Sequence, residues 1–274
     1  MLDFTRLDKV RRQRPLIHCV SNIVTANDCA NLLLACGASP IMADDPAEVS
    51  EVQAACTGLH LNLGTLHTGT VPALLGAGCT ANALGHPIVL DPVGVGISAL
   101  RGTTARQLLA ELRITVIRGN LSEIKVLARG SGTVHGVDAD AADALTEETL
   151  DRVIPLVQDL ARRTGAVVAV SGAIDLVADG QTACCIRNGC AMMRRVTGTG
   201  CQLSALTAAF VAASPDKPLE AAAAAVTAMG LCGQIAQSRL TPGEGNAALR
   251  SRIIDAMYNL TPRQLEEGEA FEIR

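Results

Sequence analysis

The feature that most constrains the fold is a repeated alternation of short apolar runs with longer runs of helical spacing. Apolar runs typical of buried strands occupy 15–20, 39–43, 59–64, 87–91, 114–120 and 166–172. Segments of helical spacing lie between them, at 25–36, from residue 45, at 71–84, at 100–112 and at 146–163. Strands that alternate with helices in this way pair in parallel, so we expect one parallel sheet covered by helices.

Local signals predict where several helices begin and end. Thr25 precedes a helical run, and Asp28 lies three residues after Thr25, which is the spacing of a capping box. Gly37 ends the same run, as glycine does after many helices. Asp45 before Pro46 predicts the N-cap and first turn of the next helix. Asn120 can cap the short helix that contains Glu123.

The later part of the chain adds a different pattern. The segment 174–189 predicts a β-hairpin that turns at Asp179-Gly180, and mostly helix follows from the glycine-rich stretch near residue 198 to about Leu260. We expect 130–143 to form a surface loop. The long uncharged run 221–238 is rich in alanine and predicts a buried helix, not a membrane span. No linker divides the chain, so we expect a single domain over 1–274.

Composition excludes several classes of function. The chain has no Trp, one Tyr and three Phe, so it lacks the aromatic platforms on which single-stranded nucleic acid stacks. Its net charge of −4 offers no basic stripe for nucleic acid. The ten cysteines form no CxxC pairs, and the start of the chain shows no signal peptide. We therefore expect a cytoplasmic protein with reduced cysteines, and neither a nucleic acid nor a membrane as partner.

Polar residues and glycines follow successive predicted strands. Met42 follows the second strand, Asn62 the third, Asp91 the fourth, Arg118 and Asn120 the fifth, and Ser171 the sixth. Ligands of open parallel sheets bind beyond the carboxyl ends of the strands. Polar residues at the ends of several successive strands therefore predict one shared ligand site.

The segment GTGC, Gly198 to Cys201, predicts an anion site. The two glycines lack a Cβ, so backbone can approach a ligand closely. The helix that follows leaves its first N–H groups unpaired, and these groups, with the helix dipole, suit a phosphate near Thr199 and Gly200. The segment fits neither the phosphate loop GxxxxGK(S/T) nor the dinucleotide pattern GxGxxG. An ordinary glycine turn before a core helix would have the same sequence.

Two carboxylates suit magnesium, which takes oxygen ligands from one or two carboxylates together with substrate phosphates. Asp91 and Glu123 are the candidates, and Arg118 is the natural cation for phosphate oxygens. Cys201 stands at the start of the helix, where the N-terminus should lower its pKa and nearby phosphates should raise it. Such a thiol can accept or orient a proton, which suffices for phosphoryl transfer.

Several segments together resemble the hydroxyethylthiazole kinase family. They are PLIHCVSNIVTANDCANLLLACGASPIMA, LNLGTL, ANALGHPIVLDPVGVG, IRGNLSEI, VTGTGCQLSALTAAF and IIDAMYNLTP, which span about residues 15–262 in order. The resemblance implies a ribokinase-like three-layer sandwich with a mostly parallel sheet. It also implies a homotrimer with active sites at subunit interfaces, ATP as cosubstrate, and Mg²⁺. The reaction implied is phosphorylation of the hydroxyl of 4-methyl-5-(2-hydroxyethyl)thiazole in thiamine salvage.

The resemblance also assigns roles to individual positions. Met42 and Gly198 match the positions that contact the substrate. Arg118 matches the ATP-binding arginine, and Ser171 stands where the family usually has an ATP-contacting threonine, so the hydroxyl is kept. Asn120, with Thr199 and Gly200 of the GTGC segment, completes the expected ATP site.

Other matches concern the metal and the reacting hydroxyl. Asp91 and Glu123 match family positions near the metal and the phosphates. Cys201 stands where related kinases of this fold carry the aspartate of GxGD, and we expect it to be the catalytic residue. The family's first strand usually reads HNITN and here reads HCVSN, so Cys19 and Ser21 leave the finer substrate preference open.

Other functions remain open from the sequence alone. A hydroxymethylpyrimidine-type kinase or a nicotinamide-nucleotide-hydrate dehydratase shares this fold, although both favour aspartate at position 201. A non-catalytic relative that binds thiazole or nucleotide is a further alternative. A cysteine-nucleophile hydrolase lacks an assignable histidine partner for Cys201.

Overall fold

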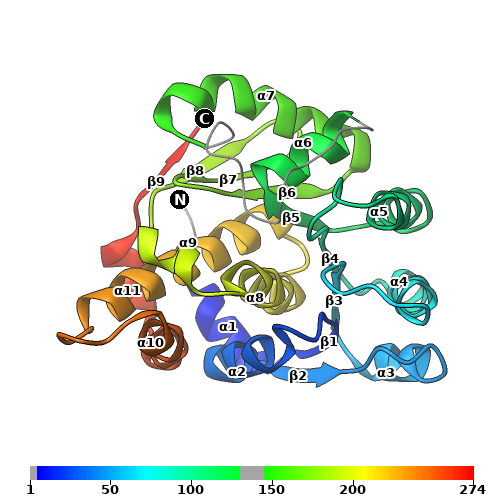
Figure 1. Cartoon of the computed structure of the whole chain (residues 1–274), viewed down its shortest axis with the longest axis horizontal. Coiled ribbons are helices and arrows are strands. Elements are labelled where there is room, and N and C mark those ends of the chain that lie inside the picture. The colour runs from blue at the N-terminus through cyan, green and yellow to red at the C-terminus, as the bar shows by residue number, and fades with distance from the viewer. Residues whose placement is uncertain (1–4, 130–144) are drawn as a thin grey trace.

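The computed structural model describes residues 5–129 and 145–274. In these residues the strands form one nine-stranded sheet, ordered β2-β1-β3-β4-β5-β6-β7-β8-β9 (Figure 1). The strands are β1 (Leu16–Val20), β2 (Ser39–Met42), β3 (Gly58–Asn62), β4 (Ile88–Asp91), β5 (Val116–Asn120), β6 (Val167–Ser171), β7 (Asp175–Ala178), β8 (Ala183–Ile186) and β9 (Phe271–Ile273). The strands from β2 to β6 pair in parallel, and β7, β8 and β9 add antiparallel pairs. The expected mostly parallel sheet is confirmed.

Helices cover both faces of the sheet and make three layers (Figure 1). One face carries α1 (Arg6–Gln13), α2 (Ala26–Cys36), α8 (Thr199–Ala213), α9 (Pro218–Ser238), α10 (Asn246–Asn259) and α11 (Pro262–Gly268). The other carries α3 (Val49–Ala55), α4 (Thr70–Leu84), α5 (Ala99–Glu111), α6 (Leu121–Arg129) and α7 (Glu147–Thr164). Each face has its own hydrophobic core, so the sheet is buried on both sides.

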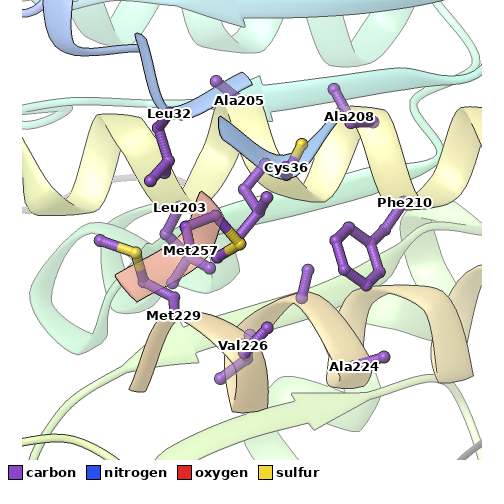
Figure 2. Close-up of a cluster of buried hydrophobic side chains, with 14 of the residues drawn as sticks. Leu32, Cys36, Leu203, Ala205, Ala208, Phe210, Ala224, Val226, Met229 and Met257 are labelled. Atoms are coloured by element: carbon purple, nitrogen blue, oxygen red, sulfur yellow. The ribbon is translucent and has the colours of Figure 1, made fainter. Parts of the chain in front are cut away.

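The core on the α8 face is built largely from small and aliphatic side chains, with one aromatic ring, Phe210, in the cluster (Figure 2). Helix α9 contributes a run of buried alanines to it, 221–225. Such small residues let helices approach closely, so few aromatic side chains are needed to fill the space. Helix α9 is long and apolar enough to cross a membrane, but 72% of its most apolar window is buried inside the protein. The expectation of a buried core helix is confirmed.

The hairpin and the capped helix at Glu123 appear as expected, and the turn 179–182 joins β7 to β8. The expected surface loop 130–143 lies outside the described residues. After α10 the chain continues through α11 to a short edge strand, β9, which pairs with β8. The sequence pattern did not predict this strand, because three residues are too few to show alternation.

The expected start of α2 at Thr25 is confirmed, but its capping box is absent, and the expected start of the next helix at Asp45 is wrong. Thr25 is the N-cap of α2 but makes no side-chain cap bond, and Asp28 does not close a capping box. The Asp28 carboxylate is buried and forms an ion pair with Arg250 of α10, because a charged partner outcompetes a local backbone amide. Asp45 accepts a bond from the Ala47 amide in a turn, and helix α3 begins only at Val49.

Candidate active site

The pleat of the sheet explains why the polar strand ends face one helix. Successive residues of a strand point to opposite faces. Leu90 of β4 packs in the core on the α4 face, whereas Val89 packs in the core on the α8 face. The next residue on the α8 face is Asp91, at the carboxyl end of β4. The same alternation directs Asn62 and Arg118 to the α8 face, so the strand ends meet the beginning of α8.

The GTGC turn packs tightly against the side chains of Thr25 and Arg118. Gly198 is the N-cap of α8, with a φ of 83° that favours glycine. A Cβ at Gly198 would lie 2.5 Å from the Thr25 side chain, and a Cβ at Gly200 would lie 2.5 Å from Arg118 Nη1. Thr199 donates its hydroxyl weakly to the carbonyl of Val196, 3.4 Å away. The backbone amides of the first turn of α8 therefore lie beside a guanidinium, which is an arrangement suited to an anion.

Cys201 lies at the centre of the site and is 8% exposed. Its Sγ accepts a hydrogen bond from Asn22 Nδ2 at 3.3 Å. Burial, followed by the nearby Asp91 carboxylate, raises the pKa of the Cys201 thiol to about 12. The lowering that we expected from the helix N-terminus is outweighed, because the thiolate would lose its hydration next to a negative charge. The thiol is therefore neutral at neutral pH.

Asp91 is 1% exposed and presents one oxygen without a partner. Asn62 Nδ2 donates to Asp91 Oδ2 at 2.8 Å. Asp91 Oδ1 is buried and has no hydrogen-bond partner among the described residues. Burial raises the pKa of Asp91, and the Arg118 guanidinium is the strongest of the opposing influences. A buried carboxylate oxygen without a partner is costly, and such groups are typical of sites that receive a ligand.

Glu123 is 4% exposed and holds two loops together. Its Oε1 accepts from the Gly94 amide and its Oε2 from the Asn120 amide, each at 2.8 Å. Asn120 Oδ1 in turn accepts from the Glu123 amide at 2.9 Å, so the expected cap is confirmed. Burial and then the Asp91 carboxylate raise the pKa of Glu123 to about 7. The two carboxylates therefore repel each other, and a cation near them would stabilise both.

Arg118 is 7% exposed, and its Nη2 donates to the Ser171 hydroxyl. Beyond Ser171, the Asp175 carboxylate accepts from the Gly172 amide at 2.9 Å. Burial raises the pKa of Asp175 to about 6, and Arg118 opposes that rise. The structure thus brings Arg118, Ser171 and the GTGC turn together. Asp175 is an additional charge at this end of the site.

Met42 stands at the carboxyl end of the edge strand β2 and is 38% exposed. It pairs in register with Cys19 of β1. Cys19 itself is 1% exposed and packs in the core, so its thiol presents no surface to solvent. The apolar residues Ile23 and Val24, which follow β1, are 83% and 63% exposed.

Three residues near the centre were not singled out from the sequence as site residues: Asn22, Thr25 and Asp175. Asn22 comes two residues after β1 and is 4% exposed. The rule that ligand sites gather at strand ends, applied to the first strand, would have found it. Asp175 begins an antiparallel strand, so that rule gives no signal for it.

Comparisons with known proteins identify the family and the fold of the chain. A model described as the hydroxyethylthiazole kinase family matches residues 7–263. A hydroxyethylthiazole kinase of Clostridium acetobutylicum is 53% identical over 267 residues, which cover 97% of this chain and 98% of that relative. The structure of a hydroxyethylthiazole kinase protein from Pyrococcus horikoshii matches with a TM-score of 0.85 and 33% identity, over 99% of this chain and 98% of that one. A ribokinase-like superfamily protein from Enterococcus faecalis matches with a TM-score of 0.60 and 14% identity, over 95% and 94% of the two chains. The expected ribokinase-like fold is confirmed.

Proposed function

The chain belongs to the hydroxyethylthiazole kinase family, and on this premise we propose that it transfers the terminal phosphoryl group of ATP to the hydroxyl of 4-methyl-5-(2-hydroxyethyl)thiazole. This reaction is a salvage step toward thiamine. The observation that carries the proposal is the meeting of Asp91, Arg118 and Cys201 at the first turn of α8. The chain would act as one kinase domain over residues 1–274.

Five residues form the proposed ATP site. Arg118 supplies the charge for phosphate oxygens, and Ser171, which accepts from Arg118 Nη2, fixes the direction of the guanidinium. The amides of Thr199 and Gly200 face the same space at the start of α8. Asn120 shapes the loop between β5 and α6 through its bonds with Glu123.

Asp91 and Glu123 would hold Mg²⁺. Asp91 Oδ1 is buried without a partner, and each Glu123 oxygen keeps a lone pair beyond the amide bond that it accepts. No group of three or more metal-binding side chains occurs in the described residues, which suits an ion that takes its other ligands from phosphates and water. When bound, Mg²⁺ would neutralise charge that develops on the phosphates.

Gly198 and Met42 would contact the thiazole, and Cys201 would orient its hydroxyl. Gly198 has no side chain, and the Thr25 side chain packs directly against it. The Cys201 sulfur is held by Asn22 Nδ2, so it presents a fixed polar group toward the phosphate-binding turn. With the hydroxyl so aligned, phosphoryl transfer depends mainly on position and charge.

Replacing Gly200 by alanine should weaken ATP binding without unfolding the protein. The added methyl would lie 2.5 Å from Arg118 Nη1, the end of a flexible side chain that can move aside. We expect the KM for ATP to rise about tenfold, because the displaced guanidinium loses charged hydrogen bonds to phosphate. Steady-state kinetics and thermal unfolding measure the two effects. An unchanged KM for ATP would contradict the placement of Arg118 at the phosphates.

The proposed assembly is a homotrimer with active sites at subunit interfaces, as the family resemblance implies. The exposed side chains of Ile23 and Val24, which follow β1, and of Met42, which ends the edge strand β2, support it, because exposed apolar side chains are typical of interfaces. The protein would reside in the cytoplasm, which the ten unpaired cysteines support.

Dilution that yields monomers should abolish turnover if neighbouring subunits complete the thiazole pocket. The measurement is specific activity against protein concentration, with the oligomeric state followed by light scattering. Full specific activity in a proven monomer would show that each subunit carries a complete site.

An assay of ADP release tests the function itself. The protein is supplied with ATP, Mg²⁺ and either the thiazole alcohol or hydroxymethylpyrimidine. We expect ADP release with the thiazole alcohol and little with the pyrimidine. The opposite preference would favour the pyrimidine kinase, and no turnover with either alcohol would favour a binding protein.

A further inference from the structure

Two buried asparagines join the site residues into one hydrogen-bonded chain. Asn22 and Asn62 are 4% and 2% exposed. Asn22 Nδ2 donates to Cys201 Sγ at 3.3 Å and to Asn62 Oδ1 at 2.9 Å. Asn62 Nδ2 donates to Asp91 Oδ2 at 2.8 Å. A continuous link therefore runs from the thiol on α8 to the carboxylate on β4 through side chains that follow or end β1 and β3.

The Asn22 side chain has two separable tasks. Its Oδ1 accepts from the amides of Val24 and Thr25, each at 3.1 Å, and so shapes the turn that leads into α2. Among the described residues, its Nδ2 donates to Cys201 and Asn62 and not to that turn. The Asn22 Oδ1 thus stabilises the backbone turn, whereas its Nδ2 binds the site residues Cys201 and Asn62.

Asn62 is fixed as firmly. Its Oδ1 accepts from the Gly64 amide at 2.8 Å as well as from Asn22. A Cβ at Gly64 would lie 2.8 Å from Asn22 Cβ, so the backbone after β3 packs directly on the Asn22 side chain. A buried amide that makes three hydrogen bonds, as Asn62 does, cannot rotate without losing them. Both amide orientations are therefore determined.

We propose that Asn22 and Asn62 are positioning residues, which fix the Cys201 sulfur and the Asp91 carboxylate relative to each other. Asn62 binds Asp91 Oδ2, so Oδ1 is the carboxylate oxygen without a partner among the described residues. Because Asn22 occupies one lone pair of the sulfur, the thiol keeps one rotamer beside the GTGC turn. This inference rests on the proposed kinase function. A displacement of about 1 Å in such an arrangement can cost about 10²-fold in rate.

The test compares three variants with wild type. Asn22→Asp keeps the acceptor for the turn and loses the donor, whereas Asn22→Ala loses both. We expect Asn22→Asp to lower kcat about 10²-fold, with binding of the thiazole alcohol close to wild type. Its unfolding temperature should fall, because the new buried oxygen faces Asn62 Oδ1 and has no donor there. Asn22→Ala should lower kcat and also thermal stability. Asn31→Asp, on the exposed face of α2, is the matched control and should change neither. If Asn22→Asp does not fold, Asn22→Ser takes its place, because its hydroxyl can still accept from the turn.

A double-mutant cycle with Cys201→Ala shows whether Asn22 acts through the sulfur. If it does, adding Asn22→Asp to Cys201→Ala should change kcat by less than about threefold, because coupled residues are not additive. Full additivity of the two losses, or an unchanged kcat in Asn22→Asp alone, would overturn the inference. Absence of thiazole phosphorylation by the wild-type protein would instead refute the proposed function, so the two failures are distinct.

Discussion

Replacing Asp91 by asparagine is expected to lower kcat by about 10³-fold or more while leaving the fold intact, since removing one preorganised electrostatic contact costs about that much. Asparagine has the same shape and can still accept the bond from Asn62 Nδ2. It lacks the negative charge at the buried Oδ1, which is proposed to hold Mg²⁺ beside the phosphates. Binding of the thiazole alcohol should change little.

The stability of the same variant makes this prediction sharper. A buried carboxylate with one unpartnered oxygen destabilises the fold, so Asp91→Asn should unfold at the same temperature as wild type or a higher one. Steady-state kinetics and thermal unfolding give the two values. Asp159→Asn, on exposed helix α7, is the control and should leave both unchanged. A kcat within tenfold of wild type for Asp91→Asn would remove this carboxylate from the chemistry.

The central part of the site could be predicted because it follows from strand periodicity alone. Asp91, Arg118 and Ser171 end parallel strands or lie within two residues of their ends, and the pleat sends all three toward α8. The bonds between Asn120 and Glu123 are equally local, since the two residues are three apart. Such features depend on residues that are close together in the sequence, so they can be predicted from one sequence.

The remaining features depend on contacts between distant parts of the chain. Asn22 meets Cys201 across 179 positions, and Asp28 meets Arg250 across 222. A capping-box spacing at Asp28 was a sound local signal, but a cation from α10 took the carboxylate instead. The rise in the pKa of Cys201 could not be predicted for a similar reason, because burial and the Asp91 charge come from the folded site and not from the start of one helix.

Replacing Cys201 separates a role in the reaction from a role in packing. Cys201→Ala should lower kcat about 10²-fold, which is the usual effect of losing a group that accepts or orients a proton. Cys201→Asp should keep kcat within about tenfold of wild type, because a carboxylate can accept the same hydrogen bond from Asn22 Nδ2 and is a better proton acceptor than a neutral thiol.

The contrast between alanine and aspartate decides between the two roles. Cys201 is 8% exposed and alanine is only one sulfur atom smaller, so alanine fits the helix start and should preserve thermal stability. Cys29→Ala, one turn along α2 from Thr25 and in the same core, is the matched cysteine control and should lower stability modestly while leaving kcat unchanged. Alanine cannot form a hydrogen bond with the substrate hydroxyl. A wild-type kcat in Cys201→Ala would therefore mean that the residue at position 201 serves packing and has no role in the reaction. Loss of activity in both Cys201→Ala and Cys201→Asp would instead mean that the sulfur acts through its size and position beside Asp91.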